Sequence, residues 1–154
     1  MLHAGTTVNV IPSEATFGGT VRTLDPKDAD MMERRICEMI TQIAKANGAV
    51  AEVDYHRYYP AIVNDSESTD FLACCAEKVL GREGVMKIAN ARMGTEDASY
   101  YLNTVPGSYG ILGSVKTHTD GICHPHHNAK FDLDESTFWV GSAVFVQCAL
   151  DFCK

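Results

Sequence analysis

The sequence has few of the features that mark nucleic-acid-binding or repetitive proteins. It contains one tryptophan and five prolines, and it shows no internal repeat and no low-complexity tract. Lysine and arginine total 13 against 20 aspartates and glutamates, with no basic arm. Because phosphate binding needs a clustered cationic surface, the formal net charge of -7 excludes nucleic acid as the main partner.

Long hydrophobic runs are also missing. Residues 1–6 have neither the basic nor the apolar region of a signal peptide. The most apolar stretch, residues 138–152, is interrupted by Ser142, Gln147 and Asp151 and is short for a membrane span. We therefore expect a soluble, cytoplasmic protein with no membrane partner.

Several catalytic and redox motifs are absent as well. The six cysteines show no paired CxxC spacing, which favours reduced thiols acting as small buried hydrophobes over a disulfide framework. The glycines at 107, 110 and 113 lack the spacing of a phosphate-binding loop, and there is no GxSxG element.

The composition is that of an ordinary globular protein, with 45% apolar residues. The length of 154 residues is enough for one domain or two small ones. Strict alternation predicts a strand over residues 15–23, and residues 6–10 form a shorter extended segment that could pair with it. A helix is predicted from Asp25 and Pro26 to Asn47 and Gly48, followed by a long strand over residues 49–59. The apolar stripe of this predicted helix consists of Met32, Ile36, Met39, Ile40 and Ile43.

The second half reads as α/β. A polar start at residues 64–69 precedes a helix that ends at Gly81, with Phe71, Leu72, Cys75 and Val79 facing inward. Short strands are predicted at residues 85–88 and 109–112, and a helix capped by Thr95 lies between them. A polar loop over residues 116–130 leads into a final helix over residues 135–152, whose wide apolar surface indicates burial against a sheet. The first half would have three strands with only one helix to cover them, which leaves two sheet edges exposed, and the second half would have one or two short strands for three helices. Each half therefore lacks partners, which suggests a piece of something larger.

The densest group of possible metal ligands is Cys123, His124, His126 and His127. Three interpretations stay open: a polar surface loop, a local zinc site built on Cys123, His124 and His126, or one histidine acting with ligands from elsewhere.

Arg22 could bind a carboxylate or simply pair with a neighbouring acid. Asn9 could orient a substrate carbonyl or satisfy local backbone groups. Glu96 and Asp97 suit the first turn of a helix better than an acid–base pair.

Three motifs in order resemble one family. They are Asn-Val-Ile-Pro-Ser-Glu at residues 9–14 with Gly-Thr-Val-Arg-Thr at 19–23; Met-Gly-Thr-Glu-Asp at 93–97 with Val-Pro-Gly at 105–107; and His-Asn-Ala-Lys-Phe at 127–131. Together they resemble the metal-dependent amidohydrolases of the hippurate hydrolase, N-acyl-amino-acid amidohydrolase and auxin-conjugate hydrolase group. The one departure within the third motif is Ala129, where the family usually has proline.

The resemblance implies a partial lid (dimerisation) domain over residues 1–62 and the C-terminal segment of a zinc-exopeptidase-like α/β catalytic domain over residues 63–154. It implies a centre of two divalent metal ions, zinc or manganese, with His127 as one ligand. Arg22 and Asn9 would contact the substrate, an N-acyl or aromatic-acyl amino acid. The family's His-x-Cys-Gly-His-Asp and paired-glutamate motifs are missing. We therefore expect an inactive chain that forms a homo-oligomer or needs its N-terminal half; the alternative is an interaction module without catalysis.

Overall fold

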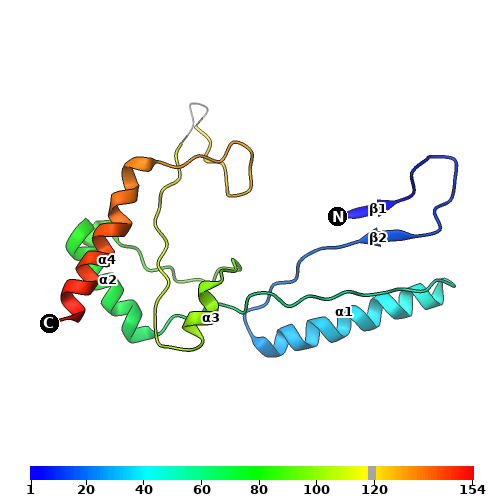
Figure 1. Ribbon diagram of the computed structural model, residues 1–154, viewed down its shortest axis with the longest axis horizontal. Coiled ribbons are helices and arrows are strands. Elements are labelled where there is room, and N and C mark those ends of the chain that lie inside the picture. The colour runs from blue at the N-terminus through cyan, green and yellow to red at the C-terminus, as the bar shows by residue number, and fades with distance from the viewer. Residues whose placement is uncertain (118–120) are drawn as a thin grey trace. The chain divides into compact units, whose positions relative to one another are not determined.

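The protein forms two compact units, Met1–Ala61 and Ile62–Lys154, in a computed structural model that describes residues 1–117 and 121–154 (Figure 1). Cys75, Ser99 and Val140 are the buried residues of the described chain, so most of its apolar side chains lie at the surface. None of the described helices is both long and apolar enough to cross a membrane.

The first unit begins with a two-stranded antiparallel hairpin. Strand β1 (Leu2–Ala4) pairs with β2 (Ala15–Phe17) so that His3 lies opposite Thr16, and Gly18 N donates to Met1 O at 3.0 Å. The predicted strand over residues 15–23 is therefore right only at its start, and its partner is not the segment 6–10. Because Met1 already pairs with Gly18, no residue of β1 is left opposite residues 19–23.

Helix α1 (Pro26–Ala46) forms as the sequence predicts. The Asp25 side chain accepts a hydrogen bond from Lys27 N at 2.8 Å, which caps the free amides at the helix start. Asn47 ends the helix, and Gly48 takes the left-handed conformation with φ of 71°. The half-buried residues of the helix recur mostly at helical spacing: Ala29, Met32, Glu33, Ile36, Cys37, Glu38, Ile40 and Ala44. Met39 and Ile43, expected in this stripe, are exposed.

The segment that follows α1 runs back along the helix in the first unit (Figure 1). Ala49 N donates to Ala44 O at 2.9 Å, and Arg57 binds Asp30 at 2.6 Å and also Glu33. Alternate residues Ala51, Val53 and Tyr55 are half-buried, as the predicted strand requires. No strand forms over residues 49–59, however, because no neighbouring strand among the described residues offers its backbone hydrogen-bonding groups.

The second unit is built on the pair α2 (Ser66–Leu80) and α4 (Phe138–Phe152), which lie side by side (Figure 1). Asp65 caps α2 by accepting from Ser68 N at 2.8 Å, and Gly81 ends it with φ of 75°. Cys75 and Val140 are buried at this contact, while Phe71 reaches its rim and meets the Phe152 ring at a centroid distance of 6.4 Å. The inward positions predicted for α2 are therefore right except at Phe71.

The remaining elements are short. They are η1 (Arg82–Gly84), α3 (Ala98–Leu102) and η2 (Glu135–Thr137). The strands predicted at residues 85–88 and 109–112 do not form, and the pairing in this unit among the described residues is a single bridge between Val115 and Leu133. The helix expected from Thr95 begins at Ala98, so Glu96 and Asp97 precede it rather than occupy its first turn. The expected sheet against α4 is therefore not found in the described residues.

Candidate functional site

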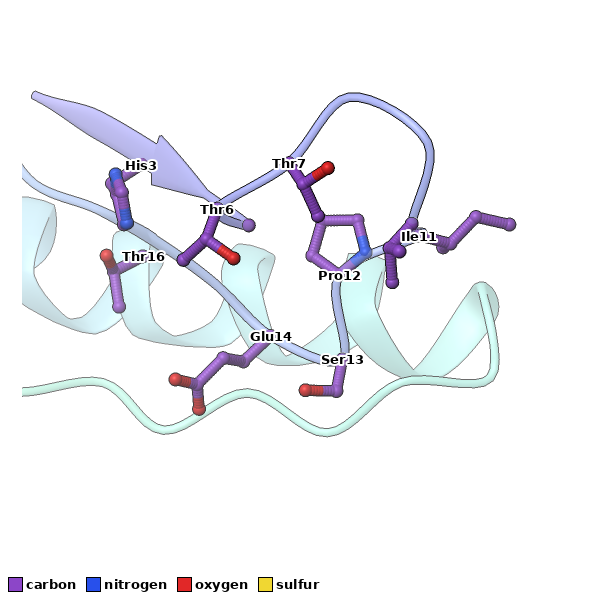
Figure 2. Close-up of a pocket in the computed structure, with 10 residues that line it drawn as sticks. His3, Thr6, Thr7, Ile11, Pro12, Ser13, Glu14 and Thr16 are labelled. Carbon is purple, nitrogen blue, oxygen red and sulfur yellow. The ribbon is translucent and has the colours of Figure 1, made fainter.

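A hollow of mixed polar and apolar lining lies on the loop between β1 and β2, with a volume of about 450 Å³. The cross-strand partners His3 and Thr16 stand on one wall, and Pro12, Ser13 and Glu14 form the other (Figure 2). Gly5 allows the loop to close: its φ is 68°, and a Cβ there would lie 3.0 Å from Pro12 Cγ. The sequence did not single out His3 and Thr16; only the register of β1 against β2 places them together.

Asn9 lies in the same loop and is exposed. Its Oδ1 accepts a hydrogen bond from Thr7 Oγ1 at 2.6 Å, which fixes the side-chain amide at the turn. The amide nitrogen has no partner among the residues the structure describes. Asn9 therefore satisfies one local hydrogen bond and keeps two N–H donors for another molecule.

Arg22 lies five residues beyond the end of β2, and is not on the polar face of a strand as expected. Its Nη1 donates to Thr20 Oγ1 at 3.1 Å, and no carboxylate in the described chain pairs with it. Its guanidinium is thus exposed with most of its donors open. Asn9 and Arg22 come from opposite ends of β2, and no hydrogen bond joins them in the described residues.

His127 stands at the corner of a tight turn. Asn128 N donates to Pro125 O at 3.2 Å across this turn, and His127 takes a φ of 67°, the one positive φ among the described non-glycine residues. This is the geometry of a type II turn, which usually places glycine or asparagine at that position. The His127 ring is exposed and has no hydrogen-bond partner in the described part of the chain.

The next residues hold this turn in place. Asn128 Oδ1 accepts from Lys130 N at 2.8 Å, and Asn128 O accepts from Phe131 N at 2.9 Å. The His126 ring packs edge-on against Phe131, with ring centroids 4.7 Å apart, so His126 makes a packing contact with Phe131. Two successive turns therefore fix the backbone on both sides of His127.

The histidine loop is tied to the rest of its unit by residues 132–134. Asp134 N donates to Ser114 O at 2.7 Å, and Lys116 Nζ lies 3.2 Å from Asp132 Oδ2. The Asp134 carboxylate accepts from the hydroxyl and N–H of Ser136, hydrogen bonds that lower its pKa and cap the turn before α4. These contacts fix the C-terminal end of the loop. His118, Thr119 and Asp120, which belong to the expected loop 116–130, lie outside the described residues.

The structure does not support a local zinc site on Cys123, His124 and His126. No group of three histidine, cysteine or acidic side chains comes together among the described residues. Cys123 Sγ instead lies 3.3 Å from Thr117 Oγ1. The His127 ring is exposed and belongs to no such group among the described residues.

Comparison with known proteins identifies the chain's relatives. The sequence profile of peptidase family M20/M25/M40 matches residues 3–151. A putative amidohydrolase, YhaA, of Bacillus subtilis is 31% identical over 94% of this chain and 36% of its own length. An N-acetyl-L-cysteine deacetylase of the same organism is 33% identical over 88% of this chain and 30% of its own, and an IAA-amino acid hydrolase of Arabidopsis thaliana is 29% identical over 96% and 34%.

A solved structure also matches. The YXEP protein of Bacillus subtilis, described as a dinuclear metal-binding peptidase of the M20 family, superposes with a TM-score of 0.67 at 28% identity. The match covers 99% of this chain and 40% of that one, and it confirms the expected α/β class. The chain therefore spans about a third of the length of the curated relatives it matches, from 30% to 36% of those named here.

Proposed function

The chain belongs to peptidase family M20/M25/M40, and from this we propose that it is the part of an amidohydrolase that completes the substrate and metal sites of a longer catalytic assembly. The complete assembly would cleave the amide bond of N-acyl or aromatic-acyl amino acids in the cytoplasm. The single observation that carries the proposal is the family match over nearly the whole chain. Relatives named for N-acetylcysteine and IAA-amino acid substrates support the choice of substrate class.

In this proposal, residues 63–154 belong to the catalytic domain and supply His127 as one ligand of two divalent ions, zinc or manganese. The exposed ring at a turn fixed on both sides supports this role, because a ligand held rigidly loses little entropy on binding. When bound, such ions would polarise the amide carbonyl and lower the pKa of water. One imidazole cannot hold two ions, so we expect the isolated chain to be inactive.

Residues 1–62 would belong to the lid and contact the substrate through Arg22 and Asn9. The open guanidinium of Arg22 suits bidentate binding of the substrate carboxylate. The two free N–H donors of Asn9 suit a carbonyl oxygen. The pairing of this lid with a second copy, which would make the assembly a homo-oligomer, belongs to the same proposal.

The test uses a chimaera in which this chain replaces the matched region of YhaA, assayed for release of free amino acid from N-acetyl and N-benzoyl amino acids. We expect His127→Ala to abolish turnover. Arg22→Lys should raise KM for these substrates and leave KM unchanged for the corresponding amino-acid amides, which lack the carboxylate. Arg34→Lys, a surface change on α1, is the matched control. Hydrolysis by the isolated chain well above that of its His127→Ala variant would contradict the proposal.

A second candidate is an interaction module without catalysis. It is favoured by the many large apolar side chains that the structure leaves exposed, including Phe145, Phe152 and Trp139. It differs from the first in one result: the chimaera would assemble but would not hydrolyse any of the N-acyl amino acids.

A further inference from the structure

Two thiols meet where α2 packs against α4 (Figure 1). Cys75 on α2 is 1% exposed, and its Sγ lies 3.6 Å from Asp151 Oδ2 on α4. Cys148 is half-buried and stands three residues before Asp151, so the two share one side of α4. Cys75 contacts Cys148 as well as Asp151. Cys75 and Cys148 therefore form a dithiol within the contact between the two helices.

This pair is not visible as a spacing in the sequence. Cys75 and Cys148 lie far apart along the chain, and only the packing of α2 on α4 brings them together. Among the described residues Cys75 is the one buried cysteine, whereas Cys74, Cys123 and Cys153 are exposed. A cysteine that only fills space needs no second thiol opposite it. Two thiols in contact can in addition exchange their protons for a covalent bond.

The surroundings of the pair tolerate the loss of its protons. The Asp151 carboxylate, which accepts from the Cys75 thiol, also accepts from Lys78 Nζ at 2.7 Å. Gln147 Nε2 and Lys154 Nζ each donate to the same carboxylate at 2.9 Å. Removal of the Cys75 proton by bond formation therefore leaves no buried acceptor without a donor, which would otherwise be costly.

We propose that Cys75 and Cys148 are a redox-active dithiol, which a peroxide oxidises reversibly to a disulfide between α2 and α4. Cys148 Sγ first attacks one oxygen of hydrogen peroxide; the O–O bond breaks, Cys148 becomes a sulfenic acid, and the departing hydroxide takes the thiol proton as water. Cys75 Sγ then attacks the sulfenic sulfur, and the S–O bond breaks as the hydroxyl leaves with the Cys75 proton as a second water. The two thiols lose two electrons, which reduce one peroxide to two waters.

The environment of Cys75 sets the order of the two steps. Burial, followed by the contacts with Cys148 and Asp151, raises the pKa of Cys75 to about 11, so about one Cys75 thiol in a thousand is ionised at pH 8. Because the thiolate is the nucleophile, Cys75 is the poorer first reactant for peroxide. In the second step its partner is already in contact, and such pairs react at effective concentrations of about 10⁵ M or more. Contact therefore outweighs the low ionisation of Cys75.

The bond should have two measurable consequences. It closes a long loop that contains α3 and the turn at His127, and a cross-link over such a loop restricts the unfolded chain. We expect the unfolding midpoint to rise by about 10 °C. Capture of the sulfenic acid by Cys75 should also protect Cys148 from irreversible oxidation to a sulfinic acid. Neither consequence requires hydrolysis or a metal ion, so both are separate from the proposed function.

The test treats the reduced chain carrying Cys74→Ala with a small excess of hydrogen peroxide at pH 8. Cys74 is replaced because it adjoins Cys75 and would make the linked peptide ambiguous. After free thiols are blocked in urea, mass spectrometry of a digest without reductant should show the peptide of Cys75 joined to that of Cys148. The intact monomer should have lost two hydrogen atoms, and dithiothreitol should restore the mass and the midpoint.

Variants separate this bond from other oxidation. Cys75→Ala and Cys148→Ser should each abolish the rise of the midpoint, and peroxide should convert Cys148 in the Cys75→Ala chain to a sulfinic acid. Cys153→Ala, an exposed cysteine just after α4, is the matched control and should keep both the link and the rise. Circular dichroism of each reduced chain establishes that the helices form. The link is read in the Cys74→Ala chain, so its detection does not depend on the folding of the Cys75→Ala chain.

Three results would overturn the proposal. The first is a Cys74→Ala chain in which peroxide oxidises Cys148 to a sulfinic acid while Cys75 stays a free thiol. The second is a linked peptide whose formation leaves the unfolding midpoint unchanged. The third is a rise of the midpoint that persists in Cys148→Ser, since another cysteine pair would then be responsible.

Discussion

Asn64 holds the backbone of Tyr109 with both ends of its side-chain amide. Its Oδ1 accepts from Tyr109 N at 2.8 Å, and its Nδ2 donates to Tyr109 O at 3.1 Å. Asp65 N also donates to Gly107 O at 2.9 Å, so the residues just before α2 take the place of a neighbouring strand for residues 107–109. This contact positions the stretch that continues to residues 110–113.

Removal of the Asn64 amide should destabilise the second unit. Asn64→Ala loses both hydrogen bonds, and we expect the free energy of unfolding to fall by about 1 kcal/mol. Asn64→Asp keeps the acceptor and loses the donor, so its effect should be smaller at neutral pH. Urea denaturation followed by circular dichroism measures both. Asn90→Ala, at an exposed loop residue, is the control; equal stability of Asn64→Ala and this control would contradict the prediction.

Neighbouring cysteines should react at very different rates. Cys74 is exposed, whereas Cys75 is 1% exposed, and burial, contact with Cys148 and contact with Asp151 raise the pKa of Cys75 to about 11. Since the thiolate is the reactive form, iodoacetamide near neutral pH should alkylate Cys74 well before Cys75. Mass spectrometry of peptides after timed labelling reads the order. Urea should remove the difference, and equal rates in the native chain would show that α2 and α4 do not pack as described.

Local signals in the sequence predicted the helices well. Asp25, Pro26 and Gly48 bound α1, and Asp65 and Gly81 bound α2, because caps act on the backbone within a few residues and need no distant partner. Strands were predicted poorly because, unlike a helix cap, a strand depends on a partner that can lie far away in the sequence. Residues 51, 53 and 55 alternate in burial as a strand does, yet a strand also needs a neighbour, which periodicity does not reveal.

The candidate site was predictable as a set of residues and not as a geometry. The motifs around Asn9, Arg22 and His127 indicated the family, and the match over residues 3–151 confirms the membership. The sequence did not show that Arg22 lies beyond its strand, or that His126 turns its ring onto Phe131. Both depend on contacts made after the chain has folded: the length of β1 in the first case and aromatic packing in the second.

The turn at His127 predicts an unusual order of stability among substitutions. A side chain at a φ of 67° costs about 1–2 kcal/mol, which glycine avoids. His127→Gly should therefore be as stable as the wild type or slightly more stable, because part of this gain is offset by the greater freedom of glycine in the unfolded chain. His127→Val should be less stable, since a β-branched residue tolerates this φ least. Thermal unfolding of the three chains provides the comparison, and a His127→Gly chain clearly less stable than wild type would mean that the ring itself contributes to the fold.

The contacts of the Asp151 carboxylate should make the stability of the fold depend on pH in the acid range. Its carboxylate, 10% exposed, accepts hydrogen bonds from Lys78 at 2.7 Å and from Lys154 and Gln147 at 2.9 Å each, and these hold its pKa well below the usual range. A carboxyl whose pKa is lower in the folded state stabilises the fold above its unfolded pKa of about 4, and this stabilisation is lost as pH falls below that value. Urea midpoints measured from neutral pH down to about pH 3 should therefore fall for the wild type and fall less for Asp151→Asn. Glu52→Gln, at an exposed glutamate, should follow the wild-type curve; an Asp151→Asn curve parallel to the wild type would show that the carboxylate carries no charge-dependent link between α2 and α4.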